Sequence, residues 1–288
     1  MRLGATGLSG VLGRNLKARL SGVEWVSFTG DVGDPAALAS WYAGAGRLDG
    51  LFHLAAIVPL RQVESDLPRA LRTNVEGTCN VLEAVVRAKG EGLRRPWLFF
   101  ASTSHVYESS AGPLSETSAL GPANAYGRTK LQAEDWANFY ARRHGLDLCI
   151  GRIFSYSTPE QPESYFVPAM IRKLSDAPRG AKLEIPGIHG TRDFLTPELI
   201  CRAFESFLEK KAVGVYNIGT GRALKLREII DAIQTRLGRE DLVIAPRDEG
   251  TLHLCADVSK LRGLGVELRF DLAALIERMI PLAGAENP

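Results

Sequence analysis

The sequence predicts an α/β fold, in which a doubly wound parallel sheet is followed by a smaller C-terminal α/β lobe. Short apolar runs alternate with longer amphipathic stretches up to about residue 220, and this alternation is typical of strands and helices in βαβ units. A glycine-rich segment joins an apolar start to the first amphipathic stretch. The predicted strands are residues 23–28, 51–57, 97–101, 147–154 and 213–218. The predicted helices are residues 35–45, 68–89, 124–144, 196–210 and 224–237.

The glycine-rich segment lies at the amino terminus, ahead of an amphipathic stretch at 14–20. Glycine lets the backbone turn sharply and approach a diphosphate, and the free N–H groups at a helix start bind anions. A glycine-rich turn without a ligand is the alternative. Only three residues precede Gly4, which is short for a parallel strand of about five residues, so either the first strand is truncated or the true start is missing. The residues that we expect at a dinucleotide are Gly4, Gly7, Leu8, Ser9 and Gly10.

The apolar run at 97–101 ends in three hydroxyl side chains, Ser102, Thr103 and Ser104. In open α/β sheets, ligands bind outside the carboxyl ends of the strands. A hydroxyl there can hydrogen-bond a substrate oxygen that changes between alcohol and ketone. The alternative is that these hydroxyls end the strand and cap the segment that follows.

Tyr126 and Lys130 lie one helical turn apart in the predicted helix at 124–144, for which Asn124 is a candidate N-cap. Side chains at i and i+4 share a helix face, and a nearby cation lowers the pKa of a phenol from about 10. Tyr126 would then serve as an acid or base near neutral pH. A solvated helix face would show the same spacing.

The composition is that of a globular protein, with 45% hydrophobic residues, 24% charged residues and a net charge of +2. This balance does not suggest binding to nucleic acid or to a membrane surface. No apolar stretch approaches the roughly 18 residues of a membrane helix. The four cysteines are far apart, so we expect neither a metal site nor disulfides. A cytoplasmic enzyme is the resulting expectation.

Three segments follow one another along the chain: the glycine-rich start, the apolar run that ends in hydroxyls, and the helix of Tyr126 and Lys130. In this order they resemble the extended short-chain dehydrogenases/reductases, also called the NAD-dependent epimerase/dehydratase family. The resemblance covers nearly the whole chain. It implies a Rossmann-type dinucleotide-binding domain over 1–154, to which about 192–220 returns, and a substrate-binding lobe over 155–191 and 221–288. Further matching segments are residues 52–56, 74–78, 151–154, 192–194 and 215–221, and Arg247 ten residues before the segment 257–260.

The resemblance implies roles for individual residues. Tyr126 would exchange a proton with the sugar, Lys130 would bind the nicotinamide ribose and lower the Tyr126 pKa, and Thr103 would orient the reacting oxygen. The cofactor, NAD or NADP, would contact the glycine loop, Tyr126, Lys130, Asp31, Val32, Leu54, Ala55, Ala56 and Asn74. The nucleotide-sugar substrate would contact Thr103, Ser104, His105, Arg192 and Arg247, with both arginines at its diphosphate.

The chain departs from the family pattern in ways that narrow the expected reaction. Ser104 and His105 follow Thr103, where sugar-nucleotide 4,6-dehydratases carry Asp-Glu, so 4-epimerisation or 4-keto reduction is expected at C4. A single strand at 23–28 stands where most members have two, which resembles the reductases dTDP-4-dehydrorhamnose reductase and GDP-fucose synthase. The strand at 23–28 ends without a clear acidic partner for the adenosine ribose of NAD. The sequence therefore allows either NAD or NADP as the cofactor.

Two other functions stay open. One is an NAD(P)-dependent dehydrogenase of a non-nucleotide sugar or small carbonyl compound. The other is a non-catalytic NAD(P)-sensing regulator, against which the retained Tyr126 and Lys130 argue. The resemblance also implies a homodimer that pairs the helix after Asn74 with the helix of Tyr126, and Trp136, Phe139 and Tyr140 are candidates for that interface.

Overall fold

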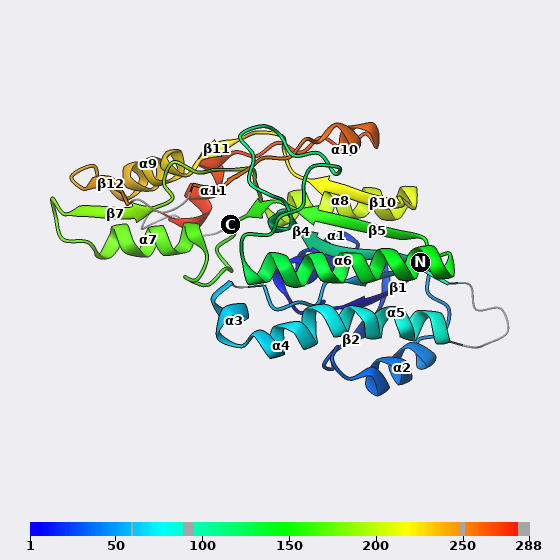
Figure 1. Cartoon of the computed structure of the whole chain (residues 1–288). Coiled ribbons are helices and arrows are strands. Elements are labelled where there is room, and N and C mark those ends of the chain that lie inside the picture. The colour runs from blue at the N-terminus through cyan, green and yellow to red at the C-terminus, as the bar shows by residue number, and fades with distance from the viewer. Residues whose placement is uncertain (59, 89–94, 248–250, 282–288) are drawn as a thin grey trace.

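The computed structural model describes residues 1–58, 60–88, 95–247 and 251–281. A six-stranded sheet with the order β10-β5-β4-β3-β1-β2 lies at its centre (Figure 1). Every neighbouring pair in this sheet is parallel. The strands are β1 (Arg2–Thr6), β2 (Glu24–Phe28), β3 (Gly50–His53), β4 (Trp97–Thr103), β5 (Leu148–Ile153) and β10 (Gly214–Ile218).

Helices cover both faces of the sheet, which confirms the predicted doubly wound architecture. On one face, α1 (Val11–Arg19) and α8 (Pro197–Lys210) contribute to a core that contains Phe99 of β4. On the other face, the core contains the next strand residue, Phe100, because successive side chains of a strand point to opposite sides. The helices that contribute to this second core are α2 (Pro35–Gly44), α5 (Gly77–Arg87) and α6 (Ala125–His144).

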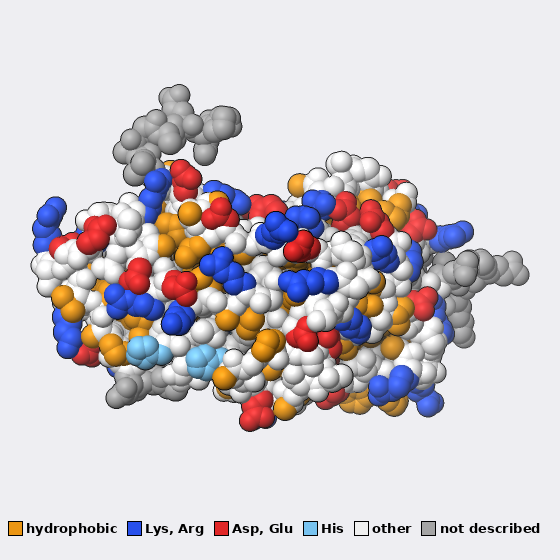
Figure 2. Space-filling view, turned by 90° about the horizontal axis from the view of Figure 1, so that it is seen from above, with side chains coloured by type: hydrophobic (Ala, Val, Ile, Leu, Met, Phe, Trp, Pro, Cys, Tyr) orange, Lys and Arg blue, Asp and Glu red, His pale blue; other side chains and the backbone are white. Residues whose placement is uncertain are grey.

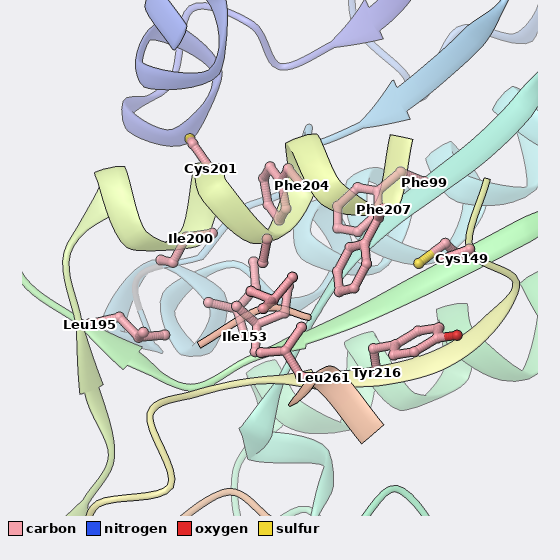
Figure 3. Packing of buried hydrophobic residues seen from close by; sticks show 14 of the residues in the cluster. Phe99, Cys149, Ile153, Leu195, Ile200, Cys201, Phe204, Phe207, Tyr216 and Leu261 are labelled. Atoms are coloured by element: carbon pink, nitrogen blue, oxygen red, sulfur yellow. The ribbon is translucent and has the colours of Figure 1, made fainter. Parts of the chain in front are cut away.

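The α8 face is rich in aromatic side chains (Figure 3). Phe204 and Phe207 of α8 point toward the sheet, and the Phe204 and Phe99 rings lie 4.4 Å apart between centroids. Both phenylalanines of α8 are fully buried, and burying one such side chain contributes about 1.5–3 kcal/mol. This packing fixes the sheet whose carboxyl edge carries the predicted site.

The first strand is longer than the sequence suggested, because it includes Gly4 and continues to Thr6. β1 spans five residues and includes Gly4, which pairs with Val26 of β2 and with Leu51 of β3. A Cβ atom at Gly4 would lie 2.7 Å from the side chains of Leu48 and Leu51. Gly4 is therefore a strand residue that makes room for core side chains, and its assignment to the dinucleotide turn was wrong.

A smaller group of elements lies beside the carboxyl ends of the strands, at one end of the molecule (Figure 1). Residues 155–191, which the sequence suggested to be loops and short elements, contain a complete amphipathic helix, α7. Its buried residues Val167 and Leu174 belong to a separate core with α9. The elements around this core are α7 (Phe166–Asp176), α9 (Leu226–Leu237), α11 (Leu272–Met279) and the parallel pair β7 (Lys182–Pro186) and β12 (Val243–Arg247).

Short strands connect the two parts. β6 (Ser155–Tyr156) pairs with β9 (Phe194–Leu195), and β8 (Thr191–Arg192) lies between β11 (Leu224–Lys225) and β13 (His253–Leu254). The remaining short helices are α3 (Leu60–Ser65), α4 (Leu67–Leu71), the π-helix η1 (Arg72–Glu76), the 3₁₀ helix η2 (Ser104–Val106) and α10 (Ser259–Gly263).

Acidic and basic side chains are interspersed over the face shown in Figure 2, as the small net charge suggests. None of the described helices is both long and apolar enough to cross a membrane. Within the described ranges, no cluster of three or more His, Cys, Asp or Glu side chains could hold a metal ion.

Candidate active site

A cavity of about 380 Å³ lies beyond the carboxyl ends of β4 and β5. It brings together residues that are far apart in the sequence, and much of its wall is apolar, including Phe154 and Phe166. The predicted site residues that line it are Leu54, Ala56, Thr103, Ser104, His105, Tyr126 and Arg192. The predicted acid–base tyrosine and the predicted substrate residues other than Arg247 therefore share one cavity.

The start of α6 places Tyr126 beside the end of β4. The Asn124 side chain accepts a hydrogen bond from the Gly127 N–H at 2.8 Å, so Asn124 is the N-cap that the sequence predicted. A Cβ atom at Gly127 would lie 2.2 Å from the backbone oxygen of His105. Glycine at this position therefore lets α6 approach η2 closely enough for Tyr126 and Thr103 to meet.

Thr103 and His105 contact the Tyr126 side chain directly. A side-chain hydrogen bond joins Thr103 and Tyr126, and the rings of His105 and Tyr126 meet edge to face with centroids 6.1 Å apart. His105 Nδ1 lies 3.1 Å from Asn124 Nδ2. Burial, assisted by the Arg192 charge, lowers the pKa of His105 to about 4, so His105 is neutral at physiological pH.

Burial dominates the protonation of Tyr126 and Lys130. It raises the pKa of the Tyr126 phenol above its ordinary value, and the nearby phenols of Tyr156 and Tyr165 raise it further, against the Thr103 hydrogen bond. Burial lowers the pKa of Lys130 to about 7, and its Nζ lies 4.0 Å from the centre of the Phe100 ring. The expected lowering of the Tyr126 pKa by Lys130 is therefore not found.

A buried ion pair joins α6, the helix of Tyr126, to β5. Arg152 Nη2 lies 2.7 Å from Glu134 Oε2, one turn beyond Lys130, and both side chains are buried. The Ser102 hydroxyl donates to the same carboxylate, and Arg152 Nη1 donates to the Tyr107 hydroxyl at 3.0 Å. These contacts tie β4, β5 and α6 together directly behind Thr103.

The turn between β1 and α1 has the features of a diphosphate site. Gly7 has a φ of +73°, and a Cβ atom there would lie 2.5 Å from the Ala55 nitrogen. Gly10 is the N-cap of α1 without a side-chain cap, and the first turn of that helix carries no acidic residue. The free N–H groups at the start of α1 can therefore bind an anion, so the turn fits the diphosphate of a dinucleotide.

Gly13, the third residue of α1, packs against this turn and was missed. A Cβ atom at Gly13 would lie 2.5 Å from the Leu8 backbone, so only glycine lets α1 pack against the turn. The three glycines at the turn and the start of α1 are Gly7, Gly10 and Gly13, one step later than the set chosen from the sequence. The pattern was visible in the sequence, because Gly13 continues the spacing of three.

Asp31 and Asn74 organise the neighbouring loops. The Asp31 carboxylate accepts from the Gly33 N–H at 2.8 Å, and Val32 is buried. Asn74, in the π-helix, accepts from the Ile57 N–H at 2.8 Å and donates to Thr129 of α6 at 3.0 Å. π-Helical turns are frequent at functional sites. Asn74 thus holds the loop after β3 against the helix of Tyr126.

The two arginines predicted at the substrate diphosphate lie in different places. Arg192 lines the cavity, its guanidinium donates to the Thr191 carbonyl at 2.9 Å, and burial lowers its pKa to about 10. Arg247 is the last residue of β12, where it pairs with Pro186 of β7. It is exposed and is not among the residues that line the cavity.

The chain is similar to nucleotide-sugar enzymes. A family model described as GDP-mannose 4,6 dehydratase matches residues 14–275. A GDP-6-deoxy-D-mannose reductase of Pseudomonas aeruginosa is 29% identical over 245 residues, which are 81% of this chain and 79% of that protein. The structure of RMD from Pseudomonas aeruginosa complexed with NADPH has a TM-score of 0.83 at 24% identity, with 97% of each chain covered.

A further solved structure, of MoeE5 in complex with UDP-glucuronic acid and NAD, is 28% identical with a TM-score of 0.81, and the match covers 97% of this chain and 98% of that one. Fold and cavity together define a dinucleotide-dependent α/β enzyme. The chain belongs to the NAD-dependent epimerase/dehydratase family, the extended short-chain dehydrogenases/reductases. The resemblance inferred from the sequence is thereby confirmed, and the two solved structures that are similar to this chain hold NADPH and NAD, the two forms of cofactor that the sequence left open.

Proposed function

We propose that this protein transfers a hydride between NAD(P) and C4 of a nucleotide-activated sugar, as a 4-keto reductase. A 4-epimerase would use the same Thr103, Tyr126 and Lys130. The similar proteins named above include a reductase of a GDP-sugar and a protein that binds a UDP-sugar. They support a nucleotide-sugar substrate for this cavity.

The lining of the cavity is the observation that carries the proposal. Among its described residues, the titratable side chains are His105, Arg192 and the tyrosines Tyr126, Tyr156 and Tyr165, and none is a carboxylic acid. A 4,6-dehydration must also remove a proton from C5 and protonate the hydroxyl that leaves C6. Carboxyl groups suit those steps, so their absence from this lining favours chemistry at a single carbon.

The protonation state of the site suits the reduction of a ketone. Tyr126 would donate its phenolic proton to the ketone oxygen, and its raised pKa keeps that proton in place at neutral pH. Thr103, hydrogen-bonded to Tyr126, would orient the same oxygen. Lys130 is expected at the nicotinamide ribose, and the bound NAD(P)H supplies the hydride.

The test compares Tyr126→Phe with Tyr165→Phe, a matched loss of a hydroxyl in the same cavity. Each protein is assayed for oxidation of NADH and NADPH with GDP-, UDP- and dTDP-linked 4-keto sugars. We expect Tyr126→Phe to lose about 10²-fold or more in turnover, with cofactor affinity nearly unchanged, and Tyr165→Phe to stay active. A fully active Tyr126→Phe enzyme would refute the assignment.

The cofactor found in the purified protein separates the two reactions. An epimerase regenerates its cofactor in every cycle, whereas a reductase must exchange it. Stoichiometric NAD released on denaturation would favour the 4-epimerase, and an empty protein that takes up NADPH would favour the reductase. Oxidation of NAD(P)H by free sugars or small carbonyl compounds, with Arg192→Ala unimpaired, would favour a non-nucleotide substrate.

We also propose a homodimer that forms through α5 and α6. These helices contact each other on one face of the sheet (Figure 1). Trp136 and Phe139 of α6 are 48% and 46% exposed, and their rings meet edge to face at 5.9 Å. Large exposed aromatic side chains are typical of interface anchors. Wild-type protein should sediment as a dimer and Trp136→Glu as a monomer; a monomeric wild type would remove the proposal.

A further inference from the structure

The segment between β6 and α7, residues 157–165, forms part of the cavity wall, and we call it the cavity loop. Four of its residues line the cavity: Ser157, Gln161, Ser164 and Tyr165. Leu12, in the first turn of α1, lines the same cavity. The cavity is therefore bounded both by this loop and by the helix start that fits the diphosphate of a dinucleotide.

The backbone hydrogen bonds within the cavity loop are local. The Gln161 N–H donates to the Thr158 carbonyl at 3.1 Å. The Tyr165 N–H donates to the Pro162 carbonyl, also at 3.1 Å. Such turns fix the shape of the loop but not its distance from α1. Among the hydrogen bonds and ion pairs of the described residues 157–165, only the ion pair of Glu160 reaches α1.

Arg14 of α1 is the partner of Glu160. Its Nη2 donates to the Glu160 carboxylate, and its Nη1 donates to the carbonyl of Ser9, in the turn between β1 and α1. One guanidinium therefore bridges the candidate diphosphate turn and the cavity loop, which are 146 residues apart in the sequence at this contact. The Arg14 and Glu160 side chains are 54% and 44% exposed, so the pair can open without exposing a buried charge.

We propose that the Arg14–Glu160 ion pair is a strap that holds the cavity loop against the start of α1 and slows release of the bound dinucleotide. This inference rests on the proposed function, because it needs a dinucleotide whose diphosphate lies at that helix start. An exposed ion pair is weak, which suits a contact that opens in every turnover. A reductase has to exchange its cofactor in each cycle, and opening of such a segment commonly limits product release.

The test measures how fast bound NADPH and NADH leave the full chain, by stopped-flow fluorescence at low and at high salt. Glu160→Gln removes the charge and keeps the shape of the side chain. Release from this variant should be about three- to fivefold faster than from the wild type at low salt. At about 1 M salt the two rates should converge, because salt screens an exposed pair. Loss of a carboxylate would by itself favour a bound anion, so faster release is opposite to a simple charge effect.

Glu205→Gln is the matched control. Glu205 of α8 pairs with Arg19 at the other end of α1, where the side chains are 27% and 36% exposed, and neither residue lines the cavity. Glu205→Gln should release both cofactors at the wild-type rate. A double-mutant cycle isolates the pair. In an Arg14→Met background, Glu160→Gln should cause no further acceleration, because the strap is already open.

Three results would overturn the strap. The first is release from Glu160→Gln at the wild-type rate. The second is acceleration by Glu160→Gln that persists in the Arg14→Met background, because Glu160 would then act without Arg14. The third is acceleration by Arg14→Met alone, which would mean that Arg14 binds the cofactor directly. A wild type that binds neither NADH nor NADPH would overturn the proposed function together with the strap, whereas normal binding with equal release rates overturns the strap alone.

Discussion

Removal of the Glu134 carboxylate should destabilise this protein strongly. Arg152 donates from Nε to both carboxylate oxygens at 3.1 Å and from Nη2 to Oε2 at 2.7 Å. The exposed fractions of the two side chains are 5% and 2%. Glu134→Gln leaves the Arg152 guanidinium buried without its countercharge. A buried charge without a partner is unfavourable because its hydration is lost and not replaced.

The magnitude follows from the burial. Breaking a buried ion pair by removing one partner costs about 3–5 kcal/mol. Glutamine retains one carbonyl acceptor for Arg152, so we expect the lower end, about 3 kcal/mol. For a chain of this size, that corresponds to a fall in Tm of roughly 5–10 °C. Urea denaturation followed by circular dichroism, with an unchanged m value, measures the free energy of unfolding directly.

The control is Asp231→Asn. Asp231 pairs with Arg227 at 2.7 Å on α9, where the side chains are 50% and 46% exposed, and such a surface pair contributes about 0–1 kcal/mol. Combining Glu134→Gln with Arg152→Met removes the unpaired charge and should recover part of the lost stability. The reasoning fails if Glu134→Gln costs no more than Asp231→Asn, or if the double variant is less stable than Glu134→Gln alone.

Three further predictions concern the dinucleotide domain. Gly7→Ala should lower the free energy of unfolding by about 2–3 kcal/mol and weaken cofactor binding, because Gly7 has a φ of +73° and a close backbone contact. The control is Gly145→Ala, at a position with a φ of +62° and open space around it. This variant should lose only about 1 kcal/mol of unfolding free energy in the same urea titration. Burial lowers the pKa of His53 from 6.5 to about 3, so the folded protein resists a proton that the unfolded chain accepts. Stability linked to His53 is therefore complete above pH 6.5 and is lost toward pH 3, and His53→Gln should show a shallower fall of the urea midpoint over this range; an equal slope would contradict the assignment. Asn74→Ala leaves partners on two elements unpaired and should cost about 2 kcal/mol; an unchanged midpoint would show that this bridge adds no stability.

Sequence patterns alone were enough to predict the family, the alternation of strands and helices, and the site residues at the end of β4 and the start of α6. These features depend on local physics. Apolar periodicity selects strand or helix, and the Asn124 side chain caps the helix that carries Tyr126 within three residues. Matching motifs in a fixed order then identified Thr103, Tyr126 and Arg192, which the structure brings to one cavity.

The protonation of those residues, and the identity of the glycines at the turn, depend on how the whole chain packs. Burial is a property of the whole fold, so the sequence could not show that desolvation raises the pKa of Tyr126 and lowers the pKa of Lys130. The close approaches that exclude a Cβ atom at Gly4 and at Gly13 involve side chains or backbone folded against them in space.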